Sequence, residues 1–420
     1  MSEFFVYLLP PKAVRHDALG ELMARDGKAA LNRGLTAARE AKRDEFYTRY
    51  VDIQKEVEAY LEFDQETFRD KVVYCNCDDP FESNFFKYFA ANFNRLGLRK
   101  LFTTSRKGST IAGKQLTFDE YIQGNRTPKR PNAVAVEIEE VTDLNGDGAR
   151  DIEDVRLFLE QNPHRRTRLQ GDGDFRSPEC VALLREADIV VTNPPFSLFS
   201  EYVSLLIQND KRFLIIGNTN AITYQDVFPH VMANQLWLGC TNFNVGMFFE
   251  VPDSYTKFHH IDEATGKKMA RVSSSCWYTN LDHGRRHRPL SLMTMSDNLR
   301  YSPGLKGKEA YDRYDNYDAI EVGTYKEIPS DFDGVMGVPV TFLDKYNPDQ
   351  FEIVGTLESS NPDNPYRTRW YTVQDQKDSF YRRFGKAGNI PLNMSGVIND
   401  VKVYKRILIR HRRPVEGDNS

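Results

Sequence analysis

The tetrad Asn193-Pro194-Pro195-Phe196 directly follows a short apolar segment, residues 189–191, that is typical of a buried strand. Proline has no backbone N–H, so this turn offers mainly carbonyl oxygens for hydrogen bonding. The Asn193 side chain adds a further carbonyl acceptor, and the Phe196 ring adds an aromatic face. Two acceptors beside a stacking surface suit a planar base that carries an exocyclic amine. The alternative is a proline-rich turn without a chemical role.

A second group of polar residues follows a strand expected at Val72–Cys75. It consists of Asn76, Asp78, Asp79 and Pro80, where a glycine-rich turn would instead indicate a nicotinamide or flavin site. Carboxylates at a strand end can bind a ligand that carries an ammonium and a sulfonium, as S-adenosylmethionine does. Asp79 before Pro80 is also an ordinary helix start, so capping alone is the alternative.

A third group of oxygen-bearing residues matches a calcium-binding loop at its first, third and fifth positions, with a further oxygen ligand at the twelfth. These are Asp143, Asn145, Asp147 and Asp154. The match is imperfect, because a strand precedes the loop, Arg150 replaces an apolar residue and the twelfth position is Asp instead of Glu. A tight turn with exposed carboxylates is the alternative. We expect any cation bound here to brace an insertion near residues 143–154 and to take no part in the chemistry.

Strand and helix patterns alternate over residues 71–295, which predicts an α/β domain with a doubly wound, mostly parallel sheet. Ligands of such sheets bind at the carboxyl ends of the strands. The polar groups that follow the strands are therefore expected at one edge. Residues 1–70 form an N-terminal segment with helical patterns, and residues 296–420 are expected to form a smaller C-terminal α+β unit. Residues 246–251 are expected to form a hairpin with Ser275–Thr279.

The composition is that of a soluble globular protein. The chain has 420 residues, of which 40% are hydrophobic and 28% are charged. Its apolar runs are too short to cross a membrane, and we expect no membrane partner. Five cysteines without a Cys-x-x-Cys pair predict a reduced, cytoplasmic protein.

Charge is distributed unevenly along the chain. The net charge is −4, yet residues 361–413 contain twelve Lys and Arg against four Asp and Glu, interleaved with aromatic residues. Such a segment suits contact with a nucleic-acid backbone, and a solvated face is the alternative. We expect phosphate contacts from His283, Arg285 and Arg286, which follow the strand expected at Ser275–Thr279, and from Lys405 and Arg406, which lie on a last strand expected over residues 401–410. The alternative for His283, Arg285 and Arg286 is that they only terminate a hairpin.

A strand that leads into Asn-Pro-Pro-Phe resembles the catalytic motif of methyltransferases that act on adenine. The wider chain resembles the EcoRI-type adenine-specific DNA methyltransferases, over roughly residues 40–410. Further segments that carry this resemblance are residues 44–48, 73–80, 213–224, 277–285 and 337–347. The resemblance implies a Rossmann-like, S-adenosylmethionine-dependent methyltransferase that flips a base out of double-stranded DNA.

The resemblance also implies roles for individual residues. Asn193 and the Pro194 carbonyl would accept the amine hydrogens of the adenine, next to Pro195, and Phe196 would stack on the base. Three further groups would bind the cofactor: Phe46, Tyr47 and Thr48 at its methionine end; the turn of Asn76, Asp78, Asp79 and Pro80; and Asp172 or Asp174 with Phe175 at its adenine. For residues 44–48 an exposed helix start is the alternative, and for residues 171–174 a plain turn.

The resemblance implies DNA methylation within a restriction–modification system or a mobile element, with residues 296–420 recognising DNA. We expect a monomer, with any cognate restriction endonuclease acting independently. Two alternatives stay open. One is an RNA-adenine or protein-amide methyltransferase with the same chemistry, and the other is a non-catalytic module that binds DNA or calcium. Phe196 in place of tyrosine and the basic aromatic segment favour DNA.

Overall fold

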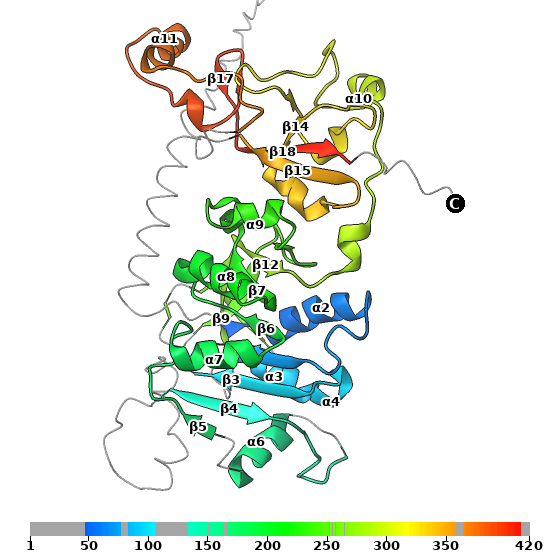
Figure 1. Cartoon of the computed structure of the whole chain (residues 1–420), viewed down its shortest axis with the longest axis vertical. Coiled ribbons are helices and arrows are strands. Elements are labelled where there is room, and N and C mark those ends of the chain that lie inside the picture. The colour runs from blue at the N-terminus through cyan, green and yellow to red at the C-terminus, as the bar shows by residue number, and fades with distance from the viewer. Residues whose placement is uncertain are drawn as a thin grey trace, which may run out of the picture. The chain divides into compact units, whose positions relative to one another are not determined.

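Eight strands form a mixed sheet in the first part of the described chain (Figure 1). In order across the sheet they are β5 (Arg166–Arg168), β4 (Val134–Ile138), β3 (Lys100–Thr104), β2 (Val72–Cys75), β6 (Ile189–Thr192), β7 (Arg212–Asn218), β12 (Ser275–Thr279) and β8 (Trp237–Leu238). The computed structural model describes residues 47–76, 83–105, 133–148, 152–162, 166–357 and 364–412, apart from positions 252, 254, 257 and 264. The helices expected before residue 47 lie outside this part.

The expectation of a mostly parallel sheet is corrected by the strand directions. The four inner strands, β3, β2, β6 and β7, are parallel to one another. The two strands at each edge of the described sheet are antiparallel to their neighbours. Antiparallel neighbours do not need the crossover connection that parallel neighbours need, so such strands can extend a parallel centre.

Helices cover both faces of this sheet, as expected for a doubly wound arrangement. On one face, Tyr74 and Val190 share a hydrophobic cluster with Leu184 and Tyr202 of two helices. On the other face, the ring of Trp277 packs edge to face with that of Phe85, a residue of another helix. The helices of this part are α2 (Tyr50–Leu61), α3 (Asn84–Ala91), α4 (Phe93–Leu96), α6 (Ile152–Gln161), α7 (Pro178–Glu186), α8 (Phe199–Gln208) and α9 (Phe228–Met232).

A second, antiparallel sheet contains the first described strand. Its order is β1 (Tyr47–Thr48), β9 (Met247–Val251), β11 (Lys268–Val272) and β10 (His260–Ile261). The expected hairpin between residues 246–251 and β12 is therefore wrong. Strand β9 pairs with β11, whereas β12 inserts between β7 and β8 of the large sheet. Two residues separate β11 from β12, so the chain passes directly from one sheet to the other.

The C-terminal part contains a third sheet. Its order is β13 (Ile320–Glu321), β14 (Met336–Pro339), β18 (Arg406–His411) and β15 (Phe351–Thr356), with β16 (Val397–Ile398) and β17 (Val401–Lys402) forming a separate pair. Two helices accompany these strands, α10 (Met295–Tyr301) and α11 (Val373–Phe384). The single strand expected over residues 401–410 is in fact divided between β17 and β18.

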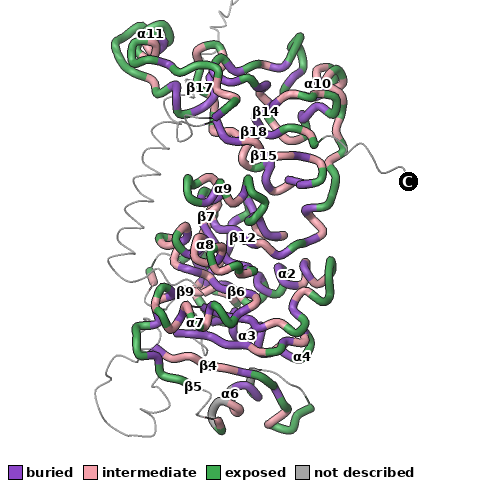
Figure 2. The backbone as a smooth tube through the Cα atoms, viewed as in Figure 1, coloured by how far each residue is buried: buried purple, intermediate pink, exposed green. Residues whose placement is uncertain are grey.

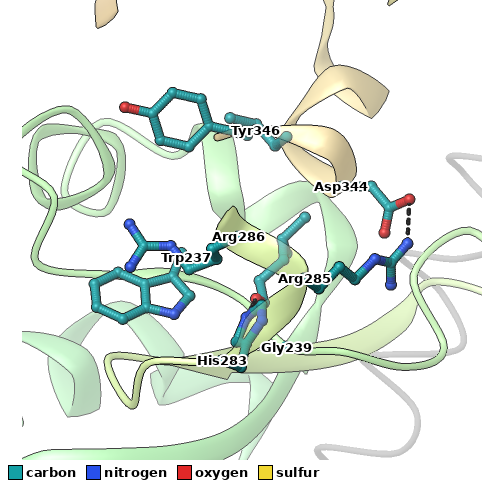
Figure 3. A pocket seen from close by; sticks show the side chains of 9 residues that line it. Trp237, Gly239, His283, Arg285, Arg286, Asp344 and Tyr346 are labelled. Carbon is teal, nitrogen blue, oxygen red and sulfur yellow. Dashed lines mark hydrogen bonds and ion pairs between the residues drawn. The ribbon is translucent and has the colours of Figure 1, made fainter. Parts of the chain in front are cut away.

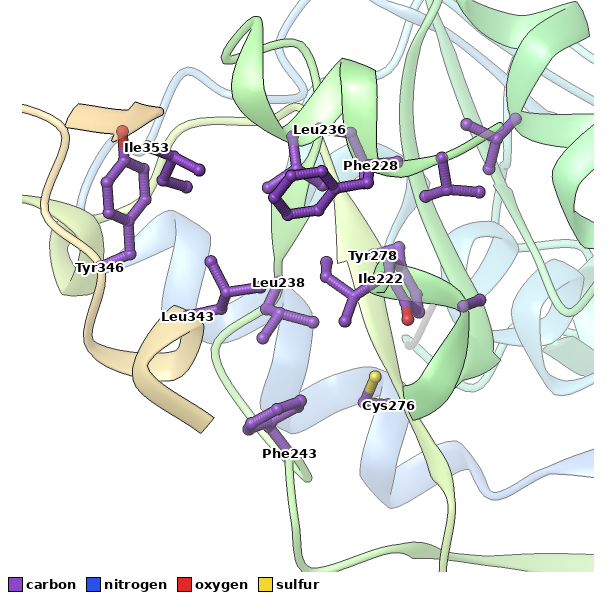
Figure 4. Close-up of a cluster of buried hydrophobic side chains, with 14 of the residues drawn as sticks. Ile222, Phe228, Leu236, Leu238, Phe243, Cys276, Tyr278, Leu343, Tyr346 and Ile353 are labelled. Atoms are coloured by element: carbon purple, nitrogen blue, oxygen red, sulfur yellow. The ribbon is translucent and has the colours of Figure 1, made fainter. Parts of the chain in front are cut away.

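One hydrophobic cluster joins the large sheet to the third sheet. Leu236 and Leu238 of the first part share it with Leu343, Tyr346 and Ile353 of the C-terminal part (Figure 4). Buried residues concentrate along the strands of the large sheet, whereas α11 is mostly exposed (Figure 2). In the described ranges, no helix is both long enough and apolar enough to cross a membrane.

Candidate active site

The order of the strands creates a switch point between β2 and β6. From β2 the chain continues to β3 on one side, and it later returns to place β6 on the other side of β2. Ligands of open α/β sheets bind outside the carboxyl ends of the strands at such a point. The residues that end β2 and β6 are therefore the first candidates for a site.

The tetrad begins directly where β6 ends. Pro194 is buried, while Asn193 and Phe196 are half-buried. Pro195 accepts a hydrogen bond from the Leu198 N–H at 2.9 Å, which closes a 3-10 turn, η2 (Phe196–Leu198). In the part of the chain that the structure describes, no hydrogen bond is made to the Pro194 carbonyl. The turn thus offers a main-chain acceptor, a side-chain amide and an aromatic ring together.

Hydrogen bonds between side chains and main chain hold the ends of the central strands together. The Thr192 hydroxyl donates to the Asn76 main-chain oxygen at 2.6 Å. The Thr104 hydroxyl donates to the Asn76 side-chain oxygen at 3.3 Å. Asn76 is fully buried. The structure therefore brings Asn76, predicted to bind the cofactor, next to the strand that carries the tetrad.

Strand β1 brings part of the 44–48 segment to the same region. Asn84, at the start of α3, donates from its amide to the Thr48 carbonyl at 2.8 Å. Thr48 is buried, and its hydroxyl has no hydrogen-bond partner among the described residues. Buried hydroxyls normally have a partner, so this one fits a ligand at the start of α3.

Four predicted cofactor residues, Phe46, Asp78, Asp79 and Pro80, lie outside the described residues. Helix α3 begins at Asn84, and the Ser83 hydroxyl caps it by accepting from the Phe85 N–H at 3.1 Å. Capping of this helix therefore does not require Asp79. Ligand binding by the turn stays a prediction.

The structure separates the two aspartates of residues 171–175. Asp174 forms an ion pair with Arg176, with an Nε–Oδ1 distance of 2.8 Å, whereas Asp172 is exposed. Phe175 is buried in the hydrophobic core, where its ring lies edge-on to Tyr202 at 4.9 Å between centroids. Contact of these residues with the adenine of the cofactor stays a prediction. Of the two carboxylates, that of Asp172 is the more accessible.

Three predicted phosphate contacts lie in a small pocket between the large sheet and the C-terminal part (Figure 3). His283 is buried, and burial lowers its pKa to about 4, so its ring is neutral near pH 7. Arg285 forms an ion pair with Asp344 at 2.6 Å. Arg286 lies over the Trp237 ring, with its guanidinium carbon 3.5 Å from the centroid. Both arginines thus have a structural contact and His283 is buried, and phosphate binding by these three residues stays a prediction.

The other two predicted phosphate contacts also bind protein groups. The Lys405 ammonium donates to the Thr223 carbonyl at 3.1 Å. Thr223 ends a 3-10 helix, η3 (Thr219–Thr223), that directly follows β7. Arg406 forms an ion pair with Glu321 at 2.6 Å. Lys405 therefore joins the C-terminal part to the region beside the tetrad, and a DNA contact of either residue stays a prediction.

Glu56 of α2 is a buried acid that sequence analysis did not identify. Its carboxylate accepts hydrogen bonds from the N–H groups of Cys240 and Thr241 at 2.6 and 2.8 Å. Burial raises its pKa from 4.5 to about 7. Glu56 shares a helical face with the buried residues Ile53, Val57 and Tyr60. This helical spacing in the sequence could have indicated that Glu56 is buried.

The loop that resembles a calcium site is closed by its own hydrogen bonds. Asp143 accepts from the N–H groups of Gly146 and Gly148 at 2.6 and 2.9 Å, and Asp154 accepts from the Leu144 N–H at 2.8 Å. Across the described ranges, no group of three or more His, Cys, Asp or Glu side chains is placed to hold a metal ion. Asn145 and Asp147 are both exposed within this turn.

Comparison with known proteins identifies the relatives of this chain. Residues 34–412 match the family described as adenine-specific methyltransferase EcoRI. The chain is 42% identical over 341 residues to the type II methyltransferase M.EcoRI of Escherichia coli, covering 79% of this chain and 90% of the relative. It is 37% identical over 386 residues to the type II methyltransferase M.MpnI of Mycoplasma pneumoniae, covering 90% and 98%.

A further relative is the type II methyltransferase M.MgeORF184P of Mycoplasma genitalium. It is 37% identical over 335 residues, which cover 79% of this chain and 87% of the relative. No solved structure matches the chain. Because the family match extends over most of the sequence, the chain belongs to the EcoRI-type family of adenine-specific methyltransferases.

Proposed function

We propose that this protein is a site-specific DNA methyltransferase that modifies the 6-amino group of an adenine flipped out of the double helix. The observation that carries the proposal is the position of the tetrad, at the carboxyl end of β6 and beside the end of β2. The Thr192–Asn76 hydrogen bond supports it, because this bond joins the strand of the tetrad to the proposed cofactor turn.

The tetrad can orient an adenine amine. The Asn193 side-chain oxygen and the Pro194 carbonyl would accept its two hydrogens, which draws the nitrogen lone pair out of ring conjugation. Phe196, half-buried at the start of η2, would stack on the base. Pro195 fixes the turn. The base must leave the duplex, because its amine is not accessible within the stack. Positioning would supply most of the rate acceleration.

We propose a Rossmann-like site for S-adenosylmethionine at the switch point. Tyr47, Thr48 and Asn76 would bind it together with the predicted residues of the neighbouring turn. The buried Thr48 hydroxyl supports this assignment. Asp172 is the accessible carboxylate for the adenine end of the cofactor. When bound, S-adenosylmethionine supplies an electrophilic methyl group.

DNA would be bound mainly by residues 296–420. The charge of this region supports the assignment, since residues 361–413 hold twelve Lys and Arg against four Asp and Glu. M.EcoRI and M.MpnI bear the name of type II methyltransferases. We therefore infer a role in restriction–modification, with the methyltransferase acting as a monomer and any cognate endonuclease acting independently.

Labelled S-adenosylmethionine tests the proposal directly. The protein is incubated with the label and with double-stranded DNA, RNA or protein, and the products are digested and separated. We expect label only in DNA, as N6-methyladenine. The Asn193→Ala variant should bind the cofactor normally yet transfer no label. Label in RNA or protein, or undiminished transfer by the variant, would contradict the proposal.

A further inference from the structure

Tyr404 is an aromatic residue that the fold leaves almost entirely in solvent. It is 85% exposed, more than any other large hydrophobic side chain in the described ranges. It lies between β17 and β18, in the basic C-terminal segment. Lys402, two residues before it, is also exposed. An exposed aromatic ring among cations is suited to contact with nucleic-acid bases.

The main chain on both sides of Tyr404 is fixed. The Ser395 hydroxyl donates to the carbonyl oxygens of Val403 and Tyr404 at 2.8 and 3.1 Å. Two residues further on, Arg406 forms a half-buried ion pair with Glu321 at 2.6 Å. The exposed ring is therefore carried by a backbone that is held in place, so contact with a ligand would have to order only the side chain.

Its location relates Tyr404 to the tetrad. The next residue, Lys405, donates to the Thr223 carbonyl at 3.1 Å. Thr223 ends η3, which follows β7, and β7 is the parallel neighbour of β6. The hydrogen bond thus holds the segment of Tyr404 against the region that follows the carboxyl end of β7, next to the strand that leads into Asn193.

We propose that Tyr404 inserts into the DNA stack and fills the space that the target adenine leaves when it flips. This assignment rests on the proposed function. Extraction of a base breaks its pairing and its stacking on both neighbours. An inserted aromatic ring restores part of the stacking and hinders return of the base. The phenol suits this position, because its ring can stack while its hydroxyl reaches water.

The test compares Tyr404→Ala, Tyr404→Phe and Tyr381→Ala. Tyr381, on α11, is 62% exposed in the same C-terminal part and serves as the matched control. The substrates are two duplexes that contain the site found by sequencing methylated DNA from cells expressing the wild type. In one, thymine faces the target adenine; in the other, an abasic position faces it.

Single-turnover methyl transfer to the paired duplex should fall about 5- to 100-fold for Tyr404→Ala, the range expected for loss of one stacking contact. It should stay near wild type for Tyr404→Phe and Tyr381→Ala. On the abasic duplex the deficit of Tyr404→Ala should largely disappear, because flipping is already easier there. The fluorescence of 2-aminopurine placed at the target position should rise less with Tyr404→Ala than with the wild type, because less of the base is flipped.

An equal deficit on both duplexes, or no deficit on either, would overturn the insertion role. A deficit as large for Tyr381→Ala as for Tyr404→Ala would overturn it as well. If the proposed function itself is wrong, the wild type will methylate neither duplex, which distinguishes that outcome from failure of the insertion role alone. Thermal unfolding and cofactor binding, measured on each variant, separate a loss of folding from a loss of base flipping.

Discussion

The Thr192 hydroxyl donates a 2.6 Å hydrogen bond to the main-chain oxygen of Asn76, and both residues are buried. The bond joins the end of the strand that leads into the tetrad to the end of the first parallel strand. It therefore fixes the distance between the proposed base-binding turn and the proposed cofactor turn. A site that transfers a group between two ligands depends on such a distance.

Replacement of Thr192 by valine tests this dependence. Thr192→Val keeps the shape of the side chain but leaves the Asn76 oxygen without its donor, so the free energy of unfolding should fall by about 1–3 kcal/mol. Methyl transfer and cofactor affinity should both decrease. The control is Thr279→Val, which removes a buried 2.7 Å bond to the Phe213 carbonyl. Equal activity of the two variants, measured at a temperature where both are folded, would contradict a specific role of Thr192.

Two phenylalanines three residues apart should separate function from stability. Phe196 is half-buried, whereas Phe199 is 1% exposed within the core. Phe196→Ala should reduce methyl transfer by about 10- to 100-fold through lost stacking, with Phe196→Trp partly active. Its free energy of unfolding should change little. Phe199→Ala should destabilise the protein by about 3–5 kcal/mol. Urea unfolding and kinetics on both variants check this, and a reversed pattern would refute the assignment of Phe196.

The buried carboxyl group of Glu56 should make stability depend on pH. Burial raises its pKa from 4.5 to about 7, so the folded protein keeps this proton over a range where the unfolded chain releases it. As the pH rises from about 4.5 to about 7, this group should therefore remove stability, by about 3 kcal/mol in total. Above pH 7 its contribution should be constant.

Comparison of Glu56→Gln with the wild type isolates this contribution. The difference in their free energies of unfolding, measured in urea at several pH values, should shift in favour of the variant between pH 4.5 and 7. Glu58→Gln is the control, because Glu58 lies on the same helix but is only half-buried. A pH-independent difference for Glu56→Gln would show that burial does not dominate the titration of this group.

Arg285 allows a structural role to be distinguished from a phosphate contact. Its ion pair with Asp344 joins the segment that follows β12 to the C-terminal part. If the pair is structural, Arg285→Met and Asp344→Asn should each reduce stability by about 1.5–3 kcal/mol, and the double variant should lose less than the sum. If Arg285 contacts DNA, only Arg285→Met should weaken binding and reduce its salt dependence. We expect the structural pattern, and DNA binding measured at several salt concentrations decides.

Local sequence patterns predicted the elements around the tetrad well. The strand expected at Val72–Cys75 has those bounds, and the strand before the tetrad, expected over residues 189–191, extends one residue further to Thr192. Pairing over long distances was not predictable in the same way. Residues 246–251 alternate like any half-buried strand, and this pattern does not specify that β11 is the partner instead of β12.

The candidate site was also predicted only in part. The tetrad was identified because its chemistry depends on neighbouring residues. Glu56 was missed because three of its four hydrogen-bond donors come from one distant segment, Cys240 and Thr241, and the fourth is Tyr60 of its own helix. Likewise, nothing in the pattern of charges indicated that Arg286 lies on the Trp237 ring or that Arg406 pairs with Glu321. Such contacts depend on tertiary packing, which a single sequence does not display.

The hydrophobic cluster shared by Leu238, Leu343 and Ile353 limits how this enzyme can be re-engineered. A chimera that takes its C-terminal part from a relative would replace one side of a close-packed contact and keep the other. Mismatched volumes at such a contact leave cavities or cause overpacking. We therefore expect altered sequence specificity to require matched changes on the catalytic side. Exchange of the C-terminal part alone would therefore not be enough, and the residues of the large sheet that pack against it would have to be exchanged as well.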